Sequence, residues 1–102
     1  SPFGKLIAVR IDSNDEGASA RAAALLSGIA MATDHVRTGR VEVLGPAPAP
    51  IARVRGRFRH RFLLKSPERR AVRSVALAVL ARVDEGLDHA RAFVDIDPIS
   101  ML

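Results

Sequence analysis

Apolar side chains occur at every second position along some stretches of this chain and at helical spacing along others. Few folds are compatible with the order of these stretches. Residues 5–12 and 91–97 alternate with a period of two, which predicts β-strands. We expect two further strands, over residues 40–44 and 58–65. The Gly-Pro-Ala-Pro-Ala-Pro run at 45–50 predicts an extended connector with few backbone donors.

Two amphipathic helices are expected between these strands. The first follows a cluster of cap residues and acids at 13–16 and fades around residues 32–35, with an apolar stripe of Ala18, Ala22, Leu25, Leu26 and Ile29. Ser66 and Pro67 are typical of the N-cap and the first residue of a helix, and Gly86 lies at the end of the second stripe. That stripe consists of Val72, Val75, Ala76, Val79, Leu80, Val83 and Leu87.

The resulting order is strand, helix, strand, strand, helix, strand. Two right-handed crossovers around a central hairpin predict an α+β fold of the βαββαβ type. We therefore expect a two-layer sandwich, in which a four-stranded sheet has both helices on one face and leaves the other face open. With 102 residues, the chain is expected to form one domain over residues 1–102.

Charge is distributed unevenly along the sequence. The chain has 16 Lys and Arg against 11 Asp and Glu, a net charge of +5, which points to an anionic partner. Residues 53–73 contain nine of these cations and a single acid, Glu68. The excess of positive charge is therefore concentrated in one segment.

The basic segment supplies the candidate DNA-binding residues. These are Arg53, Arg55, Arg57, Arg59, Arg61 and Lys65. In a strand, Arg57, Arg59 and Arg61 form a row on one face, with about 6.6 Å between neighbours. Alternatively, the arginines only make this face of the sheet soluble, and Asp95 and Asp97 balance part of their positive charge. Phe58 and Phe62 should point into the core, so any nucleic-acid contact is expected to be with phosphates.

Arg69 and Arg73 are four residues apart at the edge of the second helical stripe. Both guanidinium groups could lie beside exposed apolar surface and bind an acidic, partly hydrophobic peptide. Alternatively, both side chains extend along the flank of the helix with their charges in water.

Catalysis by this chain is not expected. It has no cysteine, no glycine-rich phosphate loop and no nucleophile elbow, and its three histidines have no metal-ligand spacing. Asp95 and Asp97 could hold a divalent cation, but pairing with the arginines is favoured. Acylphosphatases share the element order but have a phosphate-binding loop that is absent here. We expect no membrane segment and no secretion signal, and we expect a cytoplasmic location.

Three motifs in order resemble the C-terminal domain of the primosomal protein N′ (PriA) family of bacterial replication-restart helicases. They are Val-Leu-Gly-Pro-Ala-Pro-Ala-Pro at 43–50, Arg-Gly-Arg-Phe-Arg-His at 55–60 followed by Leu-Leu-Lys at 63–65, and Val-Asp-Ile-Asp-Pro at 94–98. Pro2 and Phe3 resemble the entry into that domain. The resemblance implies a fold like that of a small-subunit ribosomal protein and a chain excised from a larger helicase.

The resemblance also implies partners. These are forked or single-stranded DNA, the acidic C-terminal tail of single-stranded DNA-binding protein, the helicase core of the same polypeptide and other primosome proteins. Arg69 aligns with an arginine of the tail pocket, and Arg73 stands where some members have Gln. His60 replaces an aromatic residue common in the family. ATP, magnesium and zinc would belong to the parent helicase, with no cofactor in this chain. A free-standing RNA- or ribosome-associated protein of the same fold is the alternative.

Overall fold

Alternation along the first strand fixes which face of the sheet is buried. The computed structural model describes residues 5–96. In β1 (Lys5–Ser13), Ile7, Val9 and Ile11 are buried, while the residues between them are half-buried. In β3 (Arg57–Ser66), Phe62 and Leu64 are buried in the same way. These two central strands supply the floor of the hydrophobic core.

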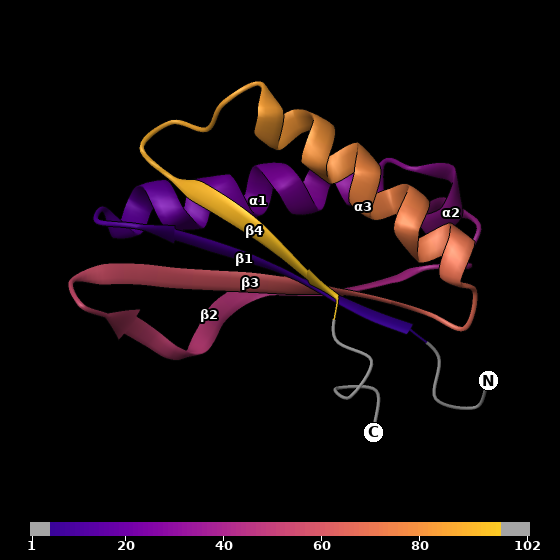
Figure 1. Ribbon diagram of the computed structural model, residues 1–102, viewed down its shortest axis with the longest axis horizontal. Helices are drawn as coiled ribbons and strands as arrows, with labels where there is room; N and C mark the ends of the chain where they lie inside the picture. The colour runs from indigo at the N-terminus through magenta and orange to yellow at the C-terminus, as the bar shows by residue number, and fades with distance from the viewer. Residues whose placement is uncertain (1–4, 97–102) are drawn as a thin grey trace.

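The sheet has four antiparallel strands in the order β2-β3-β1-β4. Its edges are β2 (Glu42–Val54) and β4 (Arg91–Ile96). The two long helices, α1 (Glu16–Met31) and α3 (Arg69–Asp84), lie side by side on the same side of the sheet (Figure 1). The predicted βαββαβ two-layer sandwich with one uncovered face is therefore confirmed.

The two long helices contribute to the core in different ways. α1 buries mostly small residues, including Ala22, Ala23 and Ser19, whereas α3 buries Val72, Val75 and Val79. Small side chains let a helix backbone approach the sheet closely, and the branched side chains of α3 fill the remaining space. No helix in the described part of the chain has the length and hydrophobicity needed to span a membrane.

A short third helix, α2 (Asp34–Arg37), was not predicted. It begins after Thr33, whose extended backbone interrupts the chain just past the end of α1. The Thr33 hydroxyl donates a hydrogen bond of 2.7 Å to the Ala30 carbonyl, so it satisfies one of the last carbonyls of α1. The expected fading of the first helix is in fact a break followed by one further turn.

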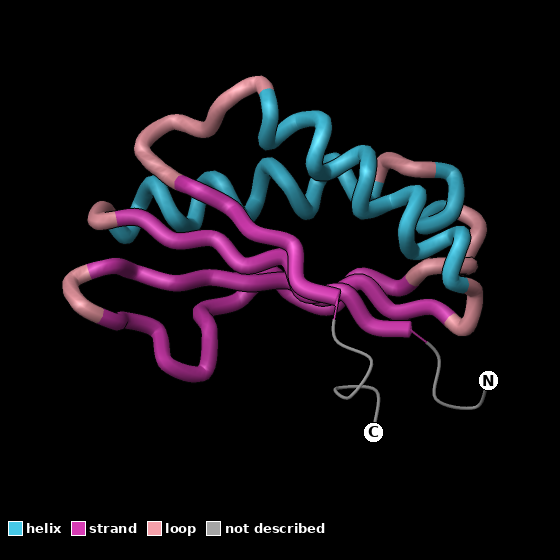
Figure 2. Tube along the Cα trace, viewed as in Figure 1, coloured by secondary structure: helices cyan, strands magenta, loops and turns pink. Residues whose placement is uncertain are grey.

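The prediction that β2 ends at residue 44 is wrong, because the strand continues through the proline run to Val54. Proline is tolerated there because β2 is an edge strand, and the pairing with β3 shifts between Leu44 and Ala47 and again between Pro48 and Arg53. Figure 2 shows β2 bending away from β3 in its middle part. Gly45 has φ +97°, and a Cβ there would lie 3.1 Å from the Arg61 carbonyl oxygen.

The start of the last long helix also differs from the prediction. Ser66 is the last residue of β3, and α3 begins at Arg69 with Glu68 as its N-cap. The Ser66 hydroxyl is buried; it donates to the Arg40 carbonyl at 2.7 Å and accepts from the Glu68 N–H at 3.0 Å. Ser66 thus stabilises the turn before the helix rather than the helix end. The expected seventh residue of the last strand, Asp97, lies outside the described residues.

Candidate nucleic-acid and peptide interfaces

The open face of the sheet is the surface that faces away from α1 and α3. On this face, cross-strand neighbours from β3, β1 and β4 form three adjacent rows. In that strand order the rows are Arg59–Asp12–Arg91, Arg61–Arg10–Phe93 and Leu63–Ala8–Asp95. Neighbouring strands lie about 4.8 Å apart, so each row brings together side chains from distant parts of the sequence.

Four of the six predicted DNA-binding residues share this open face. Arg57, Arg59 and Arg61 follow one another along β3 as predicted, and Lys65 continues the same alternation and is exposed. Arg53 and Arg55 do not extend the row. Arg55 lies in the turn before β3 with φ +52°.

Arg53 lies on the opposite face of the sheet because of the second register shift in β2. Pro48 pairs with His60 and Arg53 pairs with Phe58, so β2 advances five residues while β3 recedes by two. The difference is odd, and an odd slip turns every following side chain to the other face. The Arg53 guanidinium lies 5.0 Å from the centroid of the Phe58 ring.

Asp12 is a counter-ion that the sequence analysis missed. Its Oδ1 atom accepts hydrogen bonds of 2.7 Å from Arg57 Nε and from Arg91 Nε. Burial alone would raise the pKa of Asp12, but the hydrogen bonds and charges of Arg91 and Arg57 outweigh it and lower the pKa below its usual value. Asp12 lies 45 residues before Arg57 in the sequence, which is why no charge pattern within the basic segment revealed it.

Asp95 pairs with Arg10 of β1 rather than with the arginine row of β3. Within residues 5–96, neither Arg59 nor Arg61 forms an ion pair. Arg59 Nη1 donates instead to the Ile51 carbonyl at 3.1 Å, although Asp12 is its cross-strand neighbour. The open face thus combines paired arginines with two unpaired ones.

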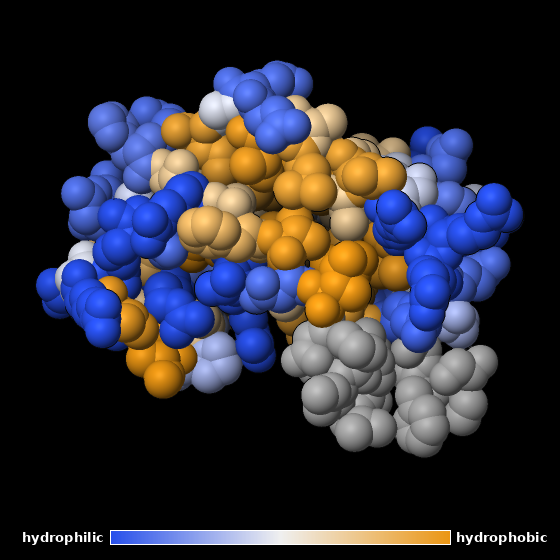
Figure 3. All heavy atoms as spheres, viewed as in Figure 1, coloured by the Kyte–Doolittle hydropathy of each residue, from blue (hydrophilic) through white to orange (hydrophobic). Residues whose placement is uncertain are grey.

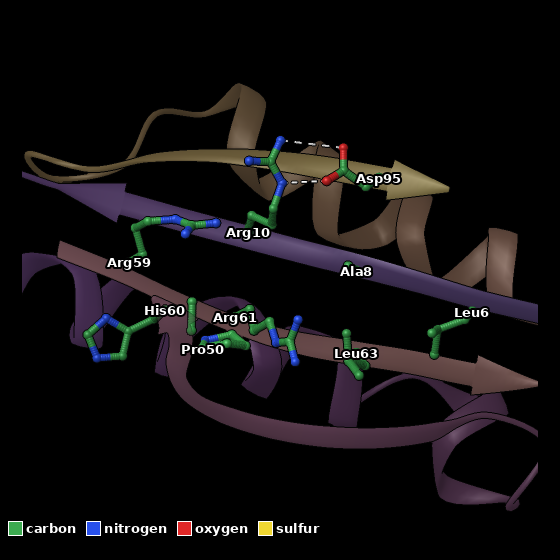
Figure 4. A pocket seen from close by; sticks show the side chains of 10 residues that line it. Leu6, Ala8, Arg10, Pro50, Arg59, His60, Arg61, Leu63 and Asp95 are labelled. Carbon is green, nitrogen blue, oxygen red and sulfur yellow. Dashed lines mark hydrogen bonds and ion pairs between the residues drawn. The ribbon is translucent and has the colours of Figure 1, made fainter. Parts of the chain in front are cut away.

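The two unpaired arginines lie beside a shallow groove of about 360 Å³ on the open face. Its lining includes Arg10, Pro50 and Leu63, and Figure 4 shows Arg59 and Arg61 projecting from β3 toward this space. Planar guanidinium groups beside apolar side chains can bind phosphate oxygens through several hydrogen bonds. The groove is therefore suited to an anionic chain lying across the sheet.

A second groove, of about 310 Å³, lies between α3 and β4. Arg69, Arg73 and Lys5 line it together with apolar residues. Leu77 and Ile96 are respectively 57% and 71% exposed there. Figure 3 shows the apolar surface as a continuous area over α3 and β4. Lys5, at the start of β1, is a lining residue that the sequence analysis did not single out.

The charge of this second groove is reinforced by the helix end. Arg69 is the first residue of α3, where the helix dipole adds partial positive charge. Within the described residues, no ion pair involves Arg69, Arg73 or Lys5. The arrangement offers cations at one end of an apolar groove, which suits a peptide with both carboxylates and apolar side chains.

Within residues 5–96, no group of three or more His, Cys, Asp or Glu side chains is placed so that it could hold a metal ion. Ser19 Oγ lies 2.6 Å from His60 Nδ1, but Ser19 is fully buried and out of reach of a substrate. Asp95 is occupied by Arg10, and its suggested partner in a cation site, Asp97, lies outside the described residues.

Comparison with solved structures shows the fold alone. The chain is similar to the de novo designed protein Foldit4, with a TM-score of 0.63 and 11% identity over 91% of this chain and 94% of that one. It is also similar to part of a hydantoinase/carbamoylase family amidase from Burkholderia ambifaria. The TM-score is 0.55 with 18% identity, over 91% of this chain and 27% of the amidase.

Sequence comparison gives the family. The chain is 31% identical over 101 residues to the replication restart protein PriA of Synechocystis sp. (strain ATCC 27184 / PCC 6803 / Kazusa). That alignment covers 98% of this chain but 11% of the relative, so the chain corresponds to a small part of that protein's length. Residues 1–99 match the family model described as primosomal protein N C-terminal domain. In agreement with the three sequence motifs, the chain belongs to the family of primosomal protein N C-terminal domains.

Proposed function

We propose that this chain is a non-catalytic binding module of a replication-restart helicase. In this proposal the open face binds the phosphates of forked or single-stranded DNA, and the groove between α3 and β4 binds the acidic C-terminal tail of single-stranded DNA-binding protein. The helicase core, its ATP, magnesium and zinc, and the contacts to other primosome proteins would belong to other parts of a longer cytoplasmic polypeptide.

One observation carries the DNA-binding proposal: Arg59 and Arg61 form no ion pair among the described residues and lie on the sheet face that no helix covers. Successive same-face positions in a strand are about 6.6 Å apart, so the two guanidinium groups can contact different phosphates. Lys65, two positions beyond Leu63, is exposed and adds a third cation to the half-buried Arg59 and Arg61. Arg57 is a weaker candidate than predicted because it is paired with Asp12, which it shares with Arg91.

The salt dependence of DNA binding tests this proposal. We expect the triple variant Arg59→Gln, Arg61→Gln and Lys65→Gln to flatten the log–log salt slope for single-stranded DNA by about 0.7 for each phosphate that the protein no longer neutralises. A matched control removes three exposed cations from the helix layer, Arg21→Gln, Arg37→Gln and Arg70→Gln. Equal slopes in the triple variant and the wild type would refute the assignment of the open face.

Three cations beside exposed apolar surface support the peptide proposal. An acidic tail can place its carboxylates near Arg69, Arg73 and Lys5 and its apolar side chains along the groove. Arg69 and Arg73 both line this groove. Their position favours peptide binding over the alternative, in which both side chains only extend along the flank of the helix.

Adjacent arginines provide a matched test of the peptide proposal. Arg69 lines the groove, whereas the neighbouring Arg70 is exposed and does not. We expect Arg69→Ala to weaken binding of a labelled acidic tail peptide about tenfold, the effect typical of removing one charge-assisted hydrogen bond. Arg70→Ala should change the affinity by less than about twofold. Equal effects of the two variants would show that the peptide senses only net charge.

A further inference from the structure

Phe93 is an aromatic side chain on the open face, and the phosphate-binding proposal does not use it. It lies in β4 opposite Arg10 and is 40% exposed. The other phenylalanines in the described part of the chain, Phe58 and Phe62, project to the helix side of the sheet. Phe93 is thus the one aromatic ring that residues 5–96 place on the open face.

Two arginines lie against this ring. The guanidinium carbon of Arg10 is 5.3 Å from the ring centroid, and that of Arg91 is 5.4 Å from it. Both distances are within the range of a cation–π contact. With both guanidinium groups beside it, the Phe93 side chain is still 40% exposed at the edge of the sheet.

Both arginines are held in place by acids on the same face. Asp95 binds Arg10, and Asp12 binds Arg91 through a hydrogen bond of 2.7 Å. Asp95 offsets the charge of Arg10, and Asp12 offsets part of the charge of Arg91, so both arginines attract phosphates less than Arg59 and Arg61 do. Their arrangement instead limits the motion of the surface around Phe93, so a ligand that stacks there loses less conformational freedom on binding.

Phe93 is in the same cross-strand row as Arg61, with Arg10 between them. Two strand spacings correspond to about 9–10 Å. A single-stranded nucleic acid that crosses the row can therefore bring phosphates to Arg61 and bases to Phe93. Exposed aromatic side chains on open four-stranded sheets are a general way to stack unpaired bases.

We propose that Phe93, with Arg10 and Arg91 beside it, is a base-stacking site for single-stranded DNA. The inference rests on the proposed DNA binding of the open face and adds a selectivity to it. Phosphate contacts through Arg59 and Arg61 are available to single and double strands alike. A stacking contact is available only to unpaired bases, so Phe93 favours single-stranded over duplex DNA.

Two oligonucleotides separate stacking from phosphate binding. The probes are a thymidine 20-mer and an abasic 20-mer with the same phosphate backbone, each titrated against the 102-residue chain at several salt concentrations. We expect Phe93→Leu to weaken binding of the thymidine 20-mer about fivefold or more, the effect of removing one base–aromatic stack. Binding of the abasic 20-mer, and the salt slope of both, should not change.

Leu25→Ala is the matched control, because Leu25 is also 40% exposed but lies on α1 in the helix layer. It should leave both affinities unchanged. Equal weakening of the two oligonucleotides by Phe93→Leu would overturn the inference, because the ring would then act only by positioning the arginines. No weakening of either would overturn it as well. Loss of salt-dependent binding to the abasic 20-mer in the Arg59, Arg61 and Lys65 triple variant tests the phosphate proposal separately.

A tryptophan reporter gives a direct second readout. The chain contains no Trp, so Phe93→Trp creates a single fluorophore at the proposed site and Leu25→Trp creates one on the helix layer. We expect the thymidine 20-mer to quench the fluorescence of Phe93→Trp, and the abasic 20-mer to leave it unchanged. Quenching of Leu25→Trp to the same extent, or quenching of Phe93→Trp by both oligonucleotides, would contradict stacking at this position.

Discussion

The open face and the α3–β4 groove use arginine in different ways. On the open face, Asp12 and Asp95 bind three of the arginines and offset part of the positive charge that a ligand meets. In the groove, Arg69 and Arg73 form no ion pair within the described residues, and they have apolar neighbours. The number of cations in a surface is therefore a poor guide to its affinity for anions. Their pairing decides how much charge a ligand meets.

The largest effect on stability and binding is expected from a substitution in the hydrophobic core on which both surfaces are built. Phe62 is fully buried beneath the open face and belongs to the same core as Val72 and Val75 of α3. Phe62→Ala should lower the free energy of unfolding by about 3–5 kcal/mol, and DNA and peptide binding should be lost together. Urea unfolding followed by circular dichroism measures the change. A decrease below about 1 kcal/mol would be inconsistent with close packing at Phe62.

The next effect should separate the two surfaces. Asp12→Asn removes the negative charge of the acceptor that Arg57 and Arg91 share, and we expect the free energy of unfolding to fall by about 1–2 kcal/mol. The same change adds one net positive charge to the open face, so single-stranded DNA should bind more tightly at low salt. The salt slope should steepen by about 0.7 if one released arginine contacts a phosphate.

Peptide binding in the groove is the internal control for Asp12→Asn. Strands rise about 3.3 Å per residue, so Asp12 and Lys5, at opposite ends of β1, are about 23 Å apart. That separation exceeds two Debye lengths at 0.1 M salt, about 20 Å. A change in acidic-peptide affinity at this salt concentration would show that the two surfaces are not independent.

The stabilising effect of Asp12 should also depend on pH. Its folded-state pKa is lowered below the usual value of 3.8, so its contribution is fully present above that value and is lost as the pH falls through the lower, folded-state pKa. The stability difference between wild type and Asp12→Asn should therefore be constant near neutral pH and shrink at acid pH. A difference that grows on acidification would have the wrong sign for a paired carboxylate.

The sequence alone was sufficient to predict the two central strands and the two long helices. The alternation of Ile7, Val9 and Ile11 is a period-two pattern with one buried face, and Phe62 and Leu64 repeat it in β3. The pattern fails in β2, because the proline run that usually ends a strand is accommodated here by two register shifts at an edge. The second shift puts Arg53, a predicted DNA-binding residue, on the helix side of the sheet, and the size of the shifts is not encoded in any local spacing.

The candidate site was less predictable than the fold because it depends on pairing between distant segments. Alternation placed Phe93 on the same face as Asp95. Only the register of β1 with β4 brings Phe93 against Arg10, 83 residues earlier. Asp12 was likewise interpreted as the end of a strand, and its role follows from contacts with two other strands. A sequence pattern predicts on which face of the sheet a side chain lies, but it does not predict which residue lies next to it on the neighbouring strand.

A smaller effect on stability is expected from Asp95→Asn. Arg10 and Asp95 have 41% and 47% of their side-chain surface exposed, and exposed ion pairs contribute less than about 1 kcal/mol. Unfolding should therefore change little, while the released Arg10 increases the affinity for single-stranded DNA. Titration with the thymidine 20-mer measures this increase. A destabilisation as large as that of Asp12→Asn would mean that the two acids are equivalent, contrary to the difference in their burial.

The smallest effect on folding is expected in the groove, where affinity should nevertheless respond. Leu77 is 57% exposed on α3 and lines the groove, whereas Met31 is 54% exposed at the end of α1 and does not. Both Leu77→Ser and Met31→Ser should change the free energy of unfolding by no more than about 0.5 kcal/mol. Acidic-peptide affinity should fall about two- to fivefold in Leu77→Ser only, because this variant can no longer bury an apolar side chain against the peptide. DNA binding should be the same in both variants. If the peptide bound Leu77→Ser as tightly as wild type, the groove would act through charge alone and would resemble the open face after all.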